Sequence, residues 1–213
     1  MRLGSRLPNI ITMARILIAP LIFYLILVPQ ATARLAAFML FLAAALSDLW
    51  DGWLARKHGW ISDFGKLWDP IADKLLMVVT LIPLYMITHP VEPLARWPVV
   101  GALPLWVVIV IFAREILITA LRAWAARRGL IIPAGRAGKH KAFLQNIFVG
   151  TAILWHTLHT AAREAGWTSP GWELWQAFHG LVLVVTLSVA VFLTLWSLGV
   201  YLWNWRALLT ETA

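Results

Sequence analysis

Four aspartates stand close together in a sequence that is otherwise strongly apolar: Asp48, Asp51, Asp69 and Asp73. Asp48 and Asp51 are three residues apart and Asp69 and Asp73 four apart, so each pair lies on one face of an α-helix. Turn formers that can reverse the chain separate the pairs, namely Gly52, Gly59, Ser62 and Gly65. Two antiparallel helices would then point four carboxylates at one another, which suits a hard divalent cation such as Mg²⁺ or Mn²⁺.

The composition indicates an integral membrane protein. Of the 213 residues, 61% are hydrophobic and only 13% are charged, whereas about a quarter of a soluble domain is charged. The absence of cysteine excludes disulfides and thiolate metal sites. The net charge of +8 comes from basic residues that flank apolar runs. This placement favours anionic lipids and phosphorylated substrates, and not nucleic acid, as partners.

The hydrophobic pattern predicts an all-α membrane protein, with residues 1–213 forming a single transmembrane domain. Residues 1–9 are expected to form a short interfacial helix. Six membrane-spanning helices follow, at about 10–28, 34–54, 67–88, 98–128, 139–160 and 175–205.

Positive charge predicts the orientation of these helices. With a cytoplasmic N-terminus, 14 of the 18 Lys and Arg residues fall on the inner side and only Arg34, Arg96 and Arg163 on the outer side. Both acid pairs then lie at the cytoplasmic surface of the inner membrane.

The simplest alternative for the acids is structural. They would cap helix ends and pair with neighbouring cations, namely Arg56, Lys57, Lys66 and Lys74. The full pattern argues against this reading, because the small residues Gly52, Ala55 and Gly65 fall at near-helical spacing from the acids. They leave room for a bulky group to lie against the backbone, which capping does not need.

The pattern Asp48-x-x-Asp51-Gly52-x-x-Ala55-Arg56, eight residues, Gly65-x-x-x-Asp69-x-x-x-Asp73 resembles the signature of the CDP-alcohol phosphatidyltransferases. These six-helix membrane enzymes, usually homodimers, move a phosphatidyl group from CDP-diacylglycerol to an alcohol and release CMP. The resemblance implies two divalent metal ions, Mg or Mn, held by the four aspartates, with Asp73 also acting as general base. It further implies that Gly52, Ala55, Arg56 and Gly65 hold the CDP moiety.

Other segments resemble one branch of this family, in which the acceptor is sn-glycerol 3-phosphate. They are Leu7–Arg15, Arg114–Ile116, Ala120–Trp124, Gly138–Lys141 with Gln145, and Leu193–Ser197. The acceptor phosphate would then be bound by Arg114, Arg122, Lys139 and Lys141. One departure from the branch is that Ala142 and Phe143 stand where hydroxyl residues are usual.

Alternatives remain for these cations and for the function. Arg114 could form a structural ion pair, although not with Glu115, because adjacent helical residues do not face each other. Lys139 and Lys141 could bind only lipid headgroups. The acceptor could instead be serine, inositol phosphate or phosphatidylglycerol. A cation- or proton-coupled transporter is a more distant alternative. A transporter would carry acids near the bilayer midplane and repeated halves, whereas this sequence concentrates its acids at one surface and shows no repeat.

Overall fold

The computed structural model describes residues 7–58, 63–91, 96–129 and 136–206, apart from the side chains of residues 7, 49, 51–56, 58, 63, 66–67, 90–91 and 136–141. Within these ranges the chain forms six α-helices and no strand. The all-α class predicted from the sequence is therefore confirmed. The expected interfacial helix falls mostly on residues outside the described part of the chain.

The helices are α1 (Leu7–Leu27), α2 (Ala31–His58), α3 (Asp63–Met86), α4 (Leu105–Arg127), α5 (Arg136–Ala165) and α6 (Pro170–Asn204), and a π-helical turn, η2 (Ile87–Val91), follows α3. The helix ends differ from expectation by up to seven residues, and the largest difference is at α4, which starts at Leu105 and not near residue 98. Since α2 continues to His58, Gly52 lies within a helix and not in the expected turn. Gly65 likewise lies in the first turn of α3.

Four segments of the described chain are long and apolar enough to cross a membrane: Pro8–Leu27, Ala31–Asp48, Trp68–His89 and Pro170–Asn204. The segment in α2 ends at Asp48 and the segment in α3 begins just before Asp69, so these acids lie at the ends of apolar stretches. That α4 and α5 also cross the membrane stays a prediction. Both helices carry more polar and charged residues than the four segments above, such as Arg114 and Glu115 of α4.

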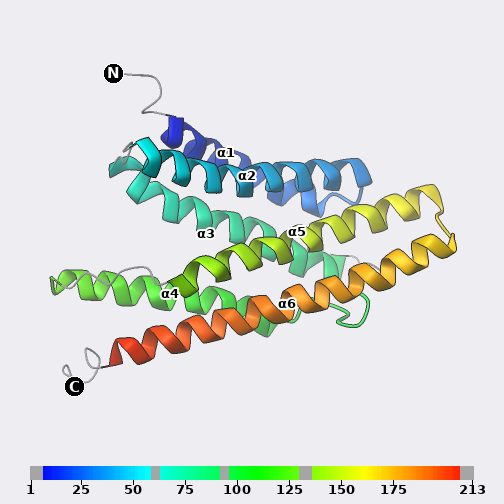
Figure 1. The fold of residues 1–213 in the computed structure, drawn as a ribbon. Coiled ribbons are helices and arrows are strands. Elements are labelled where there is room, and N and C mark those ends of the chain that lie inside the picture. The colour runs from blue at the N-terminus through cyan, green and yellow to red at the C-terminus, as the bar shows by residue number, and fades with distance from the viewer. Residues whose placement is uncertain (1–6, 59–62, 92–95, 130–135, 207–213) are drawn as a thin grey trace.

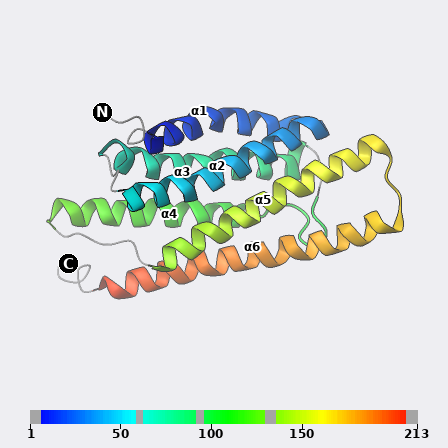
Figure 2. The same cartoon turned by 45° about the horizontal axis from the view of Figure 1, so that its top comes forward.

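The six helices run side by side in an elongated bundle (Figure 1). Helix α1 packs against both α2 and α3, α2 packs against α5, and α6 packs against α5 and α4. Figures 1 and 2 show that α1 begins, α2 ends, α3 begins and α6 ends at the same end of the bundle. The two acid-bearing helix ends are thereby brought to the end where α4 and α6 finish.

The interior and the exterior of the bundle are both apolar. Ile22, Phe41, Leu81, Phe148 and Leu183 are almost completely buried in the core. Large apolar side chains also cover the outer surface; examples are Leu17, Met39, Ile109, Leu181 and Phe192. A soluble domain would not leave so many large apolar side chains exposed, whereas lipid chains solvate them, so the protein is integral to a membrane.

The turn at Trp97–Gly101, which precedes α4, packs against α5 and α6. Trp97 and Gly101 exchange backbone hydrogen bonds of 2.6 and 2.9 Å, which closes a tight turn with Val99 and Gly101 at positive φ. The indole of Trp97 donates to Nε2 of the buried His156 on α5 at 2.9 Å. Pro98 of the same turn packs on Gly180 of α6, so this turn sets where α4 starts.

Replacing Gly180 with alanine should destabilise the protein. An added Cβ would lie 2.8 Å from Pro98 Cβ and 3.1 Å from its Cγ, and overpacking of this kind costs about 1–3 kcal/mol. We expect a lower midpoint of thermal unfolding in detergent. Gly199→Ala on the same helix is the matched control, because its Cβ would meet nothing within 4 Å. An unchanged midpoint in Gly180→Ala would contradict the close approach.

Candidate active site

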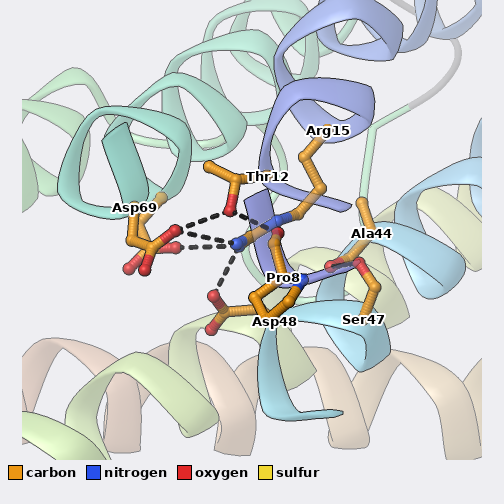
Figure 3. Close-up of polar contacts among 8 residues, drawn as sticks. Pro8, Thr12, Arg15, Ala44, Ser47, Asp48 and Asp69 are labelled. Carbon is orange, nitrogen blue, oxygen red and sulfur yellow. Dashed lines mark hydrogen bonds and ion pairs between the residues drawn. The ribbon is translucent and has the colours of Figure 1, made fainter. Parts of the chain in front are cut away.

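The acids of α2 and α3 meet around one cation that α1 supplies, Arg15. Its Nη1 atom lies 2.5 Å from Asp48 Oδ1 and 3.2 Å from Asp73 Oδ1. Its Nη2 atom lies 3.9 Å from Asp69 Oδ1. Figure 3 shows the guanidinium of Arg15 between the carboxylates of Asp48 and Asp69. The two acidic helix ends are therefore joined through the first helix.

A second side chain of α1 contacts the same cluster. The hydroxyl of Thr12 donates a hydrogen bond to Asp69 Oδ1 at 2.6 Å (Figure 3). Thr12 lies one turn before Arg15, so both side chains leave α1 on the same side. The α1 residues are buried, with Thr12 1% and Arg15 3% exposed, whereas the side chains of Asp48, Asp69 and Asp73 are 35%, 46% and 56% exposed. The carboxylates thus cover the cation and face outward.

The rest of the expected donor site is only partly described. Asp51, Gly52, Ala55 and Arg56 lie on the last turns of α2, but their side chains are outside the described residues. Gly65 is partly buried near the start of α3. The helical positions of these residues agree with the expected spacing, and their roles stay predictions.

The described carboxylates suit a divalent cation in their chemistry. Hard cations take oxygen ligands, and three carboxylates from two helices already share one positive group here. As they stand, no three acidic, His or Cys side chains within the described ranges form a group ready to hold a metal. Arg15 contacts the Oδ1 atom of each aspartate, and the partly exposed carboxylates are the groups that would bind the metal.

An apolar groove of about 530 Å³ leads along the bundle to Asp48. It lies between α2 and α5, and its walls include Phe41, Leu46, Phe143 and Gly150. Ala142 and Phe143, which depart from the related branch, both line this groove. Their apolar side chains contribute to a surface that fits hydrocarbon, with a carboxylate at its end.

The expectation that Arg114 does not pair with Glu115 is wrong. Arg114 Nη1 donates to Glu115 Oε1 at 2.9 Å, and both side chains are largely buried, at 11% and 19% exposure. Neighbouring Cβ atoms diverge on a helix, but two long side chains can bend back towards each other. In an apolar surrounding, pairing of the two charges outweighs that unfavourable geometry.

Polar atoms without hydrogen-bond partners gather on the facing sides of α4, α5 and α6. Within the described part of the chain, the buried Nε atoms of Arg114 and Arg122, Gln145 Oε1 and Tyr201 Oη make no hydrogen bond. The guanidinium of Arg122 lies over the Tyr201 ring, 5.7 Å from its centroid. The amide of Gln145 donates to Thr194 Oγ1 of α6 at 3.0 Å. Two cations and two further polar groups are thus available to a polar ligand.

A hydrogen bond ties α4 to α3 one residue after Asp73. Lys74, next to Asp73 on α3, donates to Thr119 Oγ1 at 2.8 Å, and Thr119 lies between Arg114 and Arg122 on α4. Within the described contacts, Lys74 therefore binds α4 and not the neighbouring acids. Lys139 and Lys141 begin α5, and their side chains lie outside the described residues.

Two residues at the candidate site were not assigned a role from the sequence. Arg15 was counted only as a charge that sets orientation, although a cation in an apolar span needs a partner, which is the argument that singled out Arg114. Tyr201 carries no motif signal, because it is one aromatic among many on α6. Only the packing of α6 against α4 brings it to Arg122.

Comparisons with known proteins agree with this geometry. Residues 5–204 match the family model of the CDP-alcohol phosphatidyltransferases. The chain is 36% identical to the CDP-diacylglycerol–glycerol-3-phosphate 3-phosphatidyltransferase of Rickettsia prowazekii (strain Madrid E), over 72% of this chain and 78% of that protein. It is 37% identical to the Bacillus subtilis (strain 168) protein of the same name, over 71% and 78% of the two chains. An Arabidopsis thaliana protein of that name, with the number 2, is 34% identical over 96% and 82%. With the family model covering nearly the whole chain, the protein belongs to the CDP-alcohol phosphatidyltransferase family.

Proposed function

We propose that the protein transfers the phosphatidyl group from CDP-diacylglycerol to sn-glycerol 3-phosphate, giving phosphatidylglycerophosphate and CMP. The observation that carries this proposal is the convergence of Asp48, Asp69 and Asp73 at the end of an apolar groove in a membrane-embedded bundle. A lipid with a diphosphate headgroup fits this arrangement, because its acyl chains match the apolar groove and its diphosphate can bind metal ions held by the acids. The names of the relatives support the same donor and acceptor.

The donor is proposed to lie with its acyl chains against the α2–α5 groove and its diphosphate at the acids. Two divalent cations bound by Asp48, Asp51, Asp69 and Asp73 would neutralise the diphosphate and polarise the phosphorus that is attacked. Gly52, Ala55 and Gly65 would leave space for the cytidine, and Arg56 would contact the phosphates. Members of the family generally depend on a divalent metal.

In the proposed reaction, the primary hydroxyl oxygen of glycerol 3-phosphate attacks the phosphorus that carries the diacylglycerol. The bond from this phosphorus to the bridging oxygen breaks, and CMP leaves. Asp73 accepts the hydroxyl proton; it is the most exposed of the three described acids, at 56%, and can pass the proton to water.

The acceptor phosphate is proposed to bind Arg114 and Arg122, helped by Lys139 and Lys141. The support from the structure is the pair of buried Nε atoms on α4 that lack a hydrogen-bond partner within the described chain. Gln145 Oε1 and Tyr201 Oη would take the acceptor's hydroxyl groups. Arg114 also pairs with Glu115, so Arg122 is the clearer candidate for the phosphate.

We further propose that the acid end of the bundle faces the cytoplasm, as the distribution of Lys and Arg predicts. A homodimer stays an expectation from the family resemblance.

The function is tested by CMP release from purified protein in detergent, with CDP-diacylglycerol and Mg²⁺ or Mn²⁺. Glycerol 3-phosphate, serine, inositol 1-phosphate and phosphatidylglycerol are supplied in parallel. We expect metal-dependent release with glycerol 3-phosphate alone. Release with another acceptor instead would keep the acid cluster as the catalytic centre and contradict the acceptor assignment to α4.

Changing Asp69 to Asn should abolish turnover while the protein stays folded. Asparagine keeps an oxygen that can accept from Thr12 but removes one negative charge from the metal ligands. Losing about 3 kcal/mol of transition-state stabilisation lowers the rate by roughly a hundredfold. CMP release and size-exclusion profiles measure the two effects. A folded mutant with more than a few per cent of the activity would contradict the assignment.

Changing Arg122 to Met should weaken acceptor binding specifically. A hydrogen bond between charged groups contributes about 1.5–3 kcal/mol, so the KM for glycerol 3-phosphate should rise roughly 10- to 100-fold. The KM for CDP-diacylglycerol should change little. Arg127→Met, in the last turn of the same helix, removes the same charge from an exposed position and is the control. An equal effect of the two substitutions would indicate general electrostatics and not a binding contact.

A further inference from the structure

Arg15 lies beneath the acid cluster, on its buried side. Its side chain is 3% exposed, while the three carboxylates that surround it are between 35% and 56% exposed. A guanidinium at this depth in an apolar bundle is strongly penalised unless negative groups surround it. The three aspartates likewise repel one another unless a positive charge lies among them. The cation and the acids therefore depend on each other.

Arg15 and Thr12 of α1 reach the acids at their Oδ1 atoms. Arg15 contacts the Oδ1 atoms of Asp48, Asp69 and Asp73, and Thr12 donates to Asp69 Oδ1 as well. A carboxylate held by one oxygen cannot rotate freely, so its other oxygen points in a defined direction. Side chains that orient metal ligands in this way commonly contribute 10- to 100-fold in metal affinity.

The geometry also requires arginine and not merely a positive charge. Nη1 contacts Asp48 on α2 and Asp73 on α3, while Nη2 lies 3.9 Å from Asp69 Oδ1. The planar guanidinium offers five donors in a fixed fork, whereas the ammonium group of lysine is a single point of charge. Lysine at this position could not hold acids on two helices in the same arrangement.

We propose that Arg15 is a positioning residue for the divalent metal site. It fixes the Asp48, Asp69 and Asp73 carboxylates from the buried side, with Thr12 assisting at Asp69, so that their outward oxygens are set to bind the cations. This inference rests on the metal site proposed above. Arg15 acts through the aspartates and needs no contact with the substrate.

The experiment measures Mn²⁺ binding to purified, metal-free protein by electron paramagnetic resonance of the free ion, without substrate. Wild type is compared with Arg15→Lys, Arg15→Met and Thr12→Val. Arg127→Met removes one positive charge away from the cluster and is the control. Size-exclusion chromatography and circular dichroism establish that each variant is folded.

We expect Arg15→Lys and Arg15→Met to bind Mn²⁺ at least about tenfold more weakly than wild type. Thr12→Val, which keeps the size of the side chain, should weaken binding by a few fold, and Arg127→Met should have no effect. The Mn²⁺ concentration that half-activates CMP release should rise in the same order. Because Thr12→Val leaves the ion cluster in place, it tests the proposal even if the Arg15 variants fail to fold.

The outcomes separate the two proposals. If wild type binds Mn²⁺ and the folded Arg15 and Thr12 variants bind it equally well, the positioning role is wrong while the metal site stands. Tighter binding by Arg15→Met would also overturn the proposal, since it would make Arg15 a competitor of the metal. If wild type binds no Mn²⁺, the proposed metal site fails, and this inference fails with it.

Discussion

The ion cluster of Arg15 with the three aspartates is the interaction on which the site depends. In water such a group would be loosely held, but at the end of an apolar bundle each charge needs the others. The cluster takes its members from three helices: α1 gives the cation, α2 gives Asp48, and α3 gives Asp69 and Asp73. A shift of one helix would weaken these contacts, so the ion cluster helps to fix α1, α2 and α3 relative to one another.

The position of α4, which carries Arg114 and Arg122, depends on the contacts around it. Helix α4 makes its main contacts with α6, and two further features hold it, one before its start and one along its length. The turn around Trp97 holds its start through His156 and through the close contact of Pro98 with Gly180. Lys74 reaches Thr119 further along the helix. These contacts set where α4, with Arg114 and Arg122, lies in the bundle.

Much of the fold and the centre of the site followed from the sequence, because both depend on local spacing. The apolar runs predicted six helices, and the intervals between the aspartates placed the carboxylates on common helix faces. The partners of these groups were harder to predict. Thr12 and Arg15 meet the acids only after α1 packs between two helices, and Gly52 was assigned to a turn because glycine usually marks one. In the structure, Gly52 lies within α2.

The Arg114–Glu115 pair shows why charge partners in a membrane protein are hard to predict from spacing. Rules for neighbouring residues come from helices in water, where a side chain that is badly placed for its neighbour can turn to solvent. In an apolar surrounding that choice is absent, and even adjacent side chains bend together. Arg122 differs, because it has an aromatic ring at 5.7 Å and no carboxylate among the described contacts. Of the two cations, Arg122 therefore keeps more of its charge available to a phosphate, which is the group that an anionic acceptor brings.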